Sequence, residues 1–238
     1  MKLNDNVYVL ELSNMDVTNP DKIYLTLIND FNHGLTLIDT GYPGQLSLLK
    51  KAIENEGFSV QDLNYIVLTH QDIDHVGNVT ELLNLKPEIK VISSENEKRY
   101  LNGEYTPVKV AKLEQNLAFL PEQMQGLYHM MNRFFKNNNI QNIQTVNDGD
   151  HLPFANNIKV ISTFGHTPGH ISLYLEKDKL LIAGDALTIQ DGKLIKTSEQ
   201  LNYDNTSYNQ SLEKISNLTI NTIICYHGGI LTIDELKF

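Results

Sequence analysis

Four side chains that can bind a metal ion occur within six positions of one short segment. They are His70, Asp72, Asp74 and His75. They directly follow residues 64–68, an apolar run that predicts a strand buried on both faces. Ligands at the carboxyl end of such a strand lie where α/β folds place their sites. Imidazoles with carboxylates suit zinc, iron or manganese, whereas calcium and magnesium prefer all-oxygen sites. A polar loop that merely caps the next helix is the alternative, but four candidates at this spacing favour a metal site.

Three further candidates each follow a predicted strand later in the chain. They are His166, Asp185 and His227. Because strand ends are rigid, they can hold ligands from distant parts of a chain in the geometry that a metal requires. His170 shares a loop with His166, and we expect it to support that loop and not to bind metal.

The elements that position these residues alternate between strands and helices. Apolar alternation predicts strands at 7–12, 23–28 and 35–38, and helical spacing predicts a helix over 46–53 that ends at Gly57. A second helix is expected at 76–85 and a strand at 88–92. The second half predicts strands at 157–163, 171–175, 179–183 and 221–226, with a helix at 207–218. The length of 238 residues fits one domain, 1–238.

Residues 94–142 interrupt this alternation with few β signals, and we interpret them as a helical insertion. Methionine and aromatic side chains are concentrated over 117–135. Such side chains line adaptable apolar pockets, but packing of a surface helix explains them nearly as well. The insertion is therefore either a lid over the site or a packed helical excursion.

Charge and composition limit the partners. A net charge of −10 without any basic cluster argues against nucleic-acid binding and against attraction to an anionic membrane, so a small-molecule substrate is expected. The amino-terminal residues lack the apolar core of a signal peptide, which favours the cytoplasm. The single cysteine, Cys225, lies in an apolar strand and is expected to be buried and unpaired. The sequence gives no prediction of oligomeric state.

Five motifs in fixed order resemble the metallo-β-lactamase superfamily over essentially the whole chain. They are the segments 38–41 (Ile-Asp-Thr-Gly), 69–75, 165–170 (Gly-His-Thr-Pro-Gly-His), 184–185 (Gly-Asp) and 226–229 (Tyr-His-Gly-Gly). The resemblance implies a four-layer αββα sandwich of the α/β (α+β) class, with two mixed sheets face to face and a dinuclear metal site at one edge.

The resemblance also implies roles for the candidates. His70 and His166 would bind the first metal, the second would take Asp74, His75 and His227, and Asp185 would bridge the two. Asp39 resembles the aspartate that orients the ligand loop by hydrogen bonds without touching metal.

Two positions depart from the family pattern. Asp72 stands where most members have histidine; it can still reach the first metal, but it makes iron or manganese possible beside zinc, the expected ion. Thr188 stands where the lactonases of the family carry a catalytic tyrosine. Tyr203 or Tyr208 could replace that tyrosine, although ordinary surface tyrosines are the simpler interpretation.

The preferred function is metal-dependent hydrolysis. A metal-activated hydroxide would attack the carbonyl of a small ester, lactone, thioester or amide, and Asp74 or Asp185 would pass the proton to the leaving group. Two alternatives stay open: a non-haem diiron redox enzyme, which Asp72 favours, and a metal-containing binding or regulatory module with little catalysis. The sequence does not identify the substrate.

Overall fold

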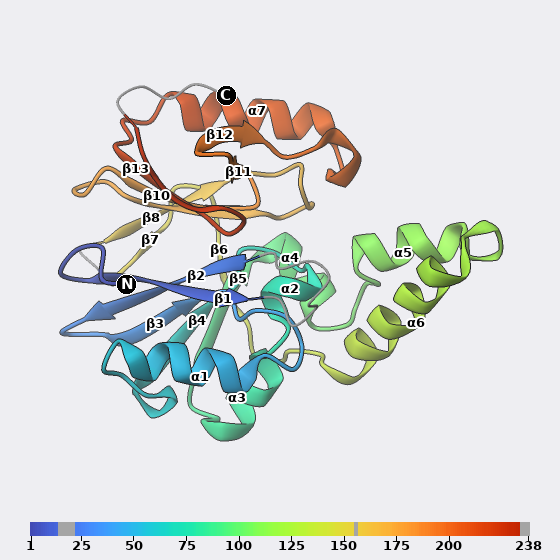
Figure 1. The fold of residues 1–238 in the computed structure, drawn as a ribbon, viewed down its shortest axis with the longest axis horizontal. Helices are drawn as coiled ribbons and strands as arrows, with labels where there is room; N and C mark the ends of the chain where they lie inside the picture. The colour runs from blue at the N-terminus through green and yellow to red at the C-terminus, as the bar shows by residue number, and fades with distance from the viewer. Residues whose placement is uncertain (14–21, 155–156, 234–238) are drawn as a thin grey trace.

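Two six-stranded mixed sheets dominate the computed structural model, which describes residues 1–13, 22–154 and 157–233 (Figure 1). In spatial order the first sheet contains β1 (Val7–Ser13), β2 (Lys22–Asp30), β3 (Gly34–Ile38), β4 (Leu63–Val67), β5 (Lys90–Ser94) and β6 (Gln144–Val146). The second contains β14 (Gly229–Thr232), β13 (Thr222–Cys225), β10 (Leu180–Gly184), β9 (Ile171–Leu175), β8 (Ile158–Ser162) and β7 (His151–Leu152). A separate hairpin pairs β11 (Leu187–Gln190) with β12 (Lys193–Lys196).

Helices cover the outer faces of both sheets. In Figure 1, α1 (Leu46–Asn55) and α3 (Val79–Leu85) lie below the first sheet, and α7 (Asn205–Ser216) lies above the second. This arrangement confirms the expected αββα sandwich. The short helices α2 (Ile73–Val76) and α4 (Glu95–Leu101) lie at the edge from which α5 (Val108–Gln115) and α6 (Glu122–Asn137) project. The expected insertion at 94–142 thus contains α4, α5 and α6.

Period-two alternation in the strands builds the layers. On β1, Val7 and Val9 enter the core between the sheets, whereas Leu10 and Leu12 enter the core on the α1 side of the first sheet. A third core joins the second sheet to α7 through Ile161, Leu181 and Leu212. Alternate side chains of a strand point to opposite faces, so each sheet supports two cores.

The strands deliver the candidate ligands to one edge of the sandwich. β4 ends just before the 69–75 loop, and β10 and β13, which pair in parallel, end just before Asp185 and His227. Parallel neighbours present their carboxyl ends on the same side, so residues far apart in sequence meet there.

One predicted helix is wrong in its bounds. The expected helix at 76–85 is divided into α2 and α3, with Gly77 and Asn78 between them. A Cβ on Gly77 would lie 2.3 Å from the Gly41 carbonyl oxygen and 2.3 Å from the Pro43 nitrogen. The side-chain Nδ2 of Asn78 donates to the Tyr42 carbonyl at 2.9 Å, so this break holds the 39–43 loop in place.

Several short strands were not expected, namely β6, β7, β11, β12 and β14. Helix α7 begins at Asn205, two residues before the predicted start, because the Asp204 carboxylate accepts hydrogen bonds from the amides of Thr206 and Ser207. Cys225 is fully buried and free, as expected. Across the described ranges, no helix combines the length and the apolarity needed to cross a bilayer.

The close approach at Gly77 predicts the effect of adding one methyl group. Gly77→Ala should lower the free energy of unfolding by about 1–3 kcal/mol, because backbone atoms must move to accept the Cβ. Gly126→Ala is the matched control: a Cβ there meets nothing within 4 Å, and the change inside α6 should stabilise the protein by about 1 kcal/mol. Urea unfolding of both variants measures this, and equal effects would contradict the packing argument.

Candidate metal centre

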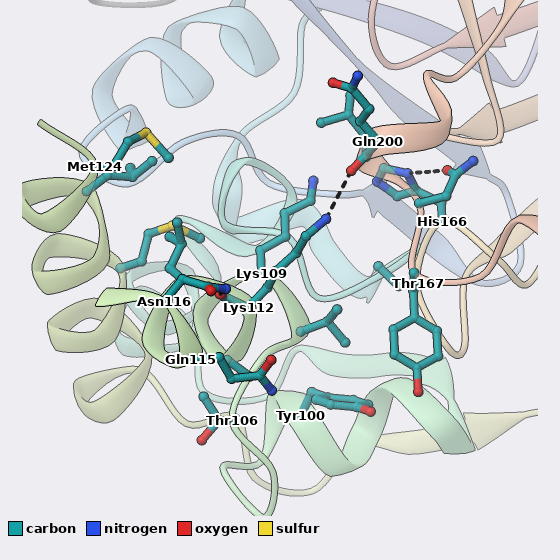
Figure 2. Close-up of a pocket in the computed structure, with 18 of the residues that line it drawn as sticks. Tyr100, Thr106, Lys109, Lys112, Gln115, Asn116, Met124, His166, Thr167 and Gln200 are labelled. Carbon is teal, nitrogen blue, oxygen red and sulfur yellow. Dashed lines mark hydrogen bonds between the residues drawn. The ribbon is translucent and has the colours of Figure 1, made fainter. Parts of the chain in front are cut away.

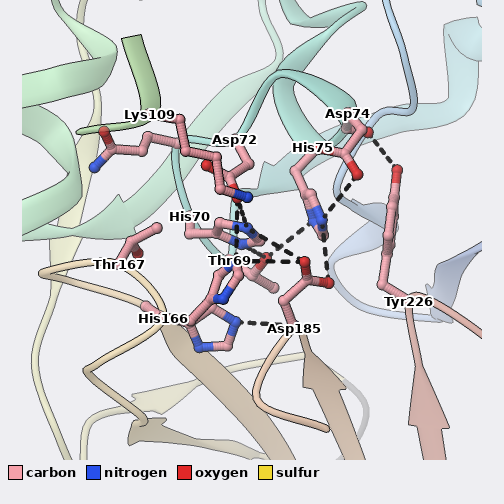
Figure 3. Close-up of polar contacts among 12 residues, drawn as sticks. Thr69, His70, Asp72, Asp74, His75, Lys109, His166, Thr167, Asp185 and Tyr226 are labelled. Carbon is pink, nitrogen blue, oxygen red and sulfur yellow. Dashed lines mark hydrogen bonds and ion pairs between the residues drawn. The ribbon is translucent and has the colours of Figure 1, made fainter. Parts of the chain in front are cut away.

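The structure brings all seven sequence-predicted ligands into two adjoining groups, and Figure 3 labels each of them except His227. Within each group the ligand atoms lie within 4.8 Å of one another. The first group is His70, Asp72, His166 and Asp185, and the second is Asp74, His75 and His227. These groups correspond to the two metal positions expected from the sequence. Their role as ligands stays a prediction.

Asp185 lies between the groups. Its Oδ2 atom is 3.9 Å from His70 Nε2 and 3.5 Å from His166 Nε2 on one side. On the other side, Oδ1 is 3.3 Å from His75 Nε2, and Oδ2 is 3.6 Å from His227 Nε2. This carboxylate therefore lies between the two groups, and the bridging role that the resemblance implies for it stays a prediction.

Asp39 fixes the tautomers of two histidines. Its carboxylate accepts hydrogen bonds from the Thr69 amide, the Thr69 hydroxyl and His75 Nδ1, each at 2.8 Å. Because the Thr69 hydroxyl proton is used on Asp39, His70 Nδ1 must donate to Thr69 Oγ1, at 2.9 Å. In its neutral form each imidazole therefore carries its proton on Nδ1 and directs Nε2 into the site. Asp39 has the orienting contacts that we expected.

His170 belongs to neither group, because both of its ring nitrogens are already hydrogen-bonded. Its Nε2 accepts a hydrogen bond from the Asp185 amide at 3.0 Å, so Nδ1 carries the proton and donates to Thr163 Oγ1 at 2.8 Å. Burial holds the pKa of His170 well below its ordinary value, in agreement with a neutral ring. It supports the backbone that carries Asp185, a contact that the sequence did not indicate.

Unpaired buried atoms test whether metal ions fit here. His70 Nε2, His75 Nε2 and Asp185 Oδ1 are buried and have no hydrogen-bond partner. Leaving such atoms unsatisfied costs about 1–3 kcal/mol each, and all three converge on the space between the two groups. Divalent cations would satisfy them, and the nitrogen and oxygen donors suit zinc, iron or manganese. The residues therefore fit a dinuclear metal centre.

The carboxylates dominate the protonation of the second group. Burial alone would lower the pKa of His75, but Asp185, Asp39 and Asp74 outweigh it and hold that pKa well above its ordinary value. The pKa of His227 is also raised, because Asp185 and Asp74 outweigh its burial. Burial and the neighbouring His75 lower the pKa of His70.

A lysine that sequence reasoning missed enters the first group. Lys109 of α5 forms an ion pair with Asp72 Oδ2, which also lies 3.2 Å from His70 Nε2 and 3.1 Å from His166 Nε2. Burial opposes ionisation of Asp72, but Lys109 and His70 hold its pKa well below the ordinary value. The insertion thus supplies a positive charge where Asp72 replaces the usual histidine. No motif marks Lys109, because 37 residues separate it from Asp72.

A second missed residue, Glu97 of α4, ties the two ligand loops together. Its carboxylate accepts hydrogen bonds from Thr167 Oγ1 at 2.6 Å, the Gly169 amide at 2.7 Å and Gln71 Nε2 at 2.9 Å. Burial outweighs these three donors and raises the pKa of Glu97 to about 7. Gln71 Oε1 then accepts from the Val108 amide at 2.8 Å, so the same network reaches the start of α5.

The two tyrosines considered from the sequence differ in their surroundings. The Tyr208 hydroxyl donates to the Ala186 carbonyl at 2.8 Å and accepts from the Thr197 amide at 2.7 Å, so it is committed to structure. Tyr203 is 59% exposed and lines a cavity beside His166. Thr188 lies in β11, paired with Ile195 of β12.

Known proteins share this sequence pattern and fold. The model of the metallo-beta-lactamase superfamily matches residues 19–227. A probable metallo-hydrolase of Bacillus subtilis, YflN, is 27% identical over 229 residues, covering 88% of this chain and 81% of YflN. A hydroxyacylglutathione hydrolase of Hamiltonella defensa is 26% identical over 217 residues, covering 90% of this chain and 65% of that enzyme.

Solved structures show the same fold. The metallo-beta-lactamase family protein TTHA1429 of Thermus thermophilus has a TM-score of 0.77 at 23% identity, over 97% of this chain and 76% of that one. A B3 metallo-beta-lactamase with an active-site glutamic acid has a TM-score of 0.68 at 16% identity, over 98% of this chain and 82% of that one.

Removing one imidazole should open the centre. His166→Ala is expected to lower bound metal by at least about half, because the remaining carboxylates then repel one another across the gap. His129→Ala is the control, since His129 is exposed on α6 and belongs to neither group. Metal analysis by mass spectrometry reads both. If His166→Ala bound as much metal as the unaltered protein, His166 would not be a ligand.

Metal binding should release protons at pH 7. The pKa values of His75 and His227 are raised when no metal is bound, so each imidazole holds its second proton to higher pH than an ordinary histidine, and a metal must displace that proton. Apparent zinc affinity should therefore rise with pH until these raised pKa values are passed. Calorimetry in buffers of different ionisation enthalpy counts the protons, and zero release at pH 7 would contradict the assignment.

Proposed function

This chain belongs to the metallo-β-lactamase superfamily and is one of its metal-dependent hydrolases, and we propose that it cleaves a small ester, lactone, thioester or amide at its carbonyl carbon. The observation that carries the proposal is the set of unpaired, inward-facing nitrogen and oxygen atoms around Asp185. The hydroxyacylglutathione hydrolase among its relatives supports an acyl compound as substrate.

Two divalent ions complete the proposed centre, with zinc first and iron or manganese as alternatives. His70, Asp72 and His166 would hold one ion, Asp74, His75 and His227 the other, and Asp185 both. When bound, such ions supply Lewis acidity, which activates water near neutral pH and polarises a carbonyl oxygen.

The chain's own residues orient the reaction. Thr69 and Asp39 hold the His70 and His75 rings so that only Nε2 faces the site. The side chains of Asp74 and Asp185 are 14% and 10% exposed, so solvent and a substrate can reach both carboxylates from the open edge. We assign them the transfer of a proton from water to the leaving group.

Space for a substrate lies beside the first group. A cavity of about 750 Å³ extends from His166 and Thr167 to the facing sides of α5 and α6 (Figure 2). Met124 and Met131 line it, so the methionine-rich part of the insertion contributes to a pocket. Tyr128 and Met131 also form a small core with Val110. The insertion therefore both lines the cavity and forms a packed unit, and its role as a lid stays a prediction.

A substrate panel tests the proposed reaction. The metal-loaded protein should hydrolyse at least one member of an ester, lactone, thioester and amide series, and its activity should fall with metal content when a chelator is added. Asp185→Asn should retain the fold and lose both activity and metal, because one oxygen of the bridging carboxylate becomes an amide. Metal-loaded protein that turns over no member of the panel would contradict the proposal.

The Lys109–Asp72 pair predicts a compensating double variant. Asp72→His alone leaves the Lys109 charge unpaired and makes the site one unit more positive, so the lower limb of the pH–rate profile should move to lower pH. Adding Lys109→Gln returns the net charge to its native value and should reverse most of that shift.

The comparison requires all variants to be loaded with the same metal, because a change of ion moves the pKa by itself. Metal competition gives a second measurement: Asp72→His should bind zinc more weakly than the double variant does. If the single and double variants had the same pH–rate profile and the same zinc affinity, Lys109 would not balance the charge of Asp72.

A further inference from the structure

The cavity beside His166 has an unusual charge for this chain. Two lysines, Lys109 and Lys112, line it. Among the described residues, no aspartate, glutamate or arginine does so. The chain as a whole carries −10. A cationic cavity in so acidic a protein attracts anions locally, whatever the net charge.

The two lysines have different partners. Lys109 is half-buried and pairs with Asp72. Lys112 is three residues further along the same face of α5, and its ammonium donates to the Gln200 carbonyl at 3.2 Å. Figure 2 shows both side chains extending in parallel toward Gln200 and His166, which lie on two separate segments of the chain. Across the described part of the chain, no carboxylate pairs with Lys112, so its charge is uncompensated.

The remainder of the cavity is mostly apolar. Leu113, Leu120, Met124, Leu127 and Met131 line the part between α5 and α6. Leu127 is 37% exposed although it is a large hydrophobic side chain. A ligand that covers these side chains removes apolar surface from water, which stabilises its binding.

We propose that this cavity binds a substrate with an apolar body and an anionic group, and that Lys112 recognises the anion. The apolar body lies between α5 and α6, the anionic group meets the Lys112 ammonium, and the reacting carbonyl faces His166 and Asp185. Only the contact of the carbonyl with His166 and Asp185 rests on the proposed hydrolysis; the other two contacts do not. It narrows the substrate class to anionic, amphiphilic acyl compounds.

Two naphthalene dyes test the recognition without any reaction. 8-Anilinonaphthalene-1-sulfonate carries a fixed negative charge, and N-phenyl-1-naphthylamine is nearly the same molecule without it. Fluorescence titration of the full chain, with its metal content measured, should show tighter binding of the sulfonate. Lys112→Gln should weaken sulfonate binding about three- to tenfold, as expected for losing one charge-assisted contact, and leave the neutral dye unchanged.

Two matched variants locate the effect. Lys177→Gln removes the same charge from an exposed position in the turn between β9 and β10 and should leave both dyes unaffected. Leu127→Ser should weaken both dyes, because the apolar lining is shared. Equal weakening by Lys112→Gln and Lys177→Gln, or an unchanged affinity in Lys112→Gln, would overturn the proposal.

Catalysis then separates this inference from the proposed function. If the substrate panel is hydrolysed, Lys112→Gln should raise KM for anionic esters and leave kcat and all neutral esters unchanged. If no ester is hydrolysed but the dyes behave as expected, the hydrolysis proposal fails and the binding site stands. Hydrolysis with no preference for anionic esters, together with equal dye affinities, would reject the binding site alone.

Discussion

The hydrogen bonds of the Asp39 carboxylate hold the candidate centre together. Asp39 is 1% exposed, and its carboxylate joins the end of β3 to both Thr69 and His75. Asp39 itself has a φ of +61°, which non-glycine residues rarely adopt, so the surrounding contacts must maintain it. Gly77 and Asn78 add the contacts to residues 41 and 42 that fix the same loop. Correctly directed imidazoles therefore depend on a residue with no assigned place among the metal ligands.

Much of this arrangement could be read from the sequence because the signals are local. Apolar alternation marks β1 to β3, and a ligand-type residue directly after a strand marks His70, Asp185 and His227. The divided helix was missed because apolar periodicity continues through Gly77, and only the close approach of the 41–43 backbone breaks it. The strands β7 and β14 are short and are defined by their partners across the sheet, so their own residues carry little signal.

The site residues that the sequence did not indicate depend on long-range contacts. Lys109 and Glu97 lie in the region recognised only as helical, and their importance comes from where α4 and α5 dock. Asp72 brings a negative charge to a position where most members have histidine, and the ion pair with Lys109 balances that charge inside the protein. The insertion therefore contributes a positive charge beside Asp72 in the first group and places two lysines in the adjoining cavity. Ile73, which lies between Asp72 and Asp74 in the sequence, packs against the small core that Val110, Tyr128 and Met131 form within the insertion.

The central claim is that seven side chains hold two divalent ions bridged by Asp185. A crystal structure of the protein loaded with zinc, with anomalous diffraction recorded on both sides of the zinc absorption edge, tests it most directly. Two anomalous peaks are expected, one beside His70 and His166 and one beside His75 and His227, with the Asp185 carboxylate contacting both. A single peak, or peaks away from Asp185, would contradict it.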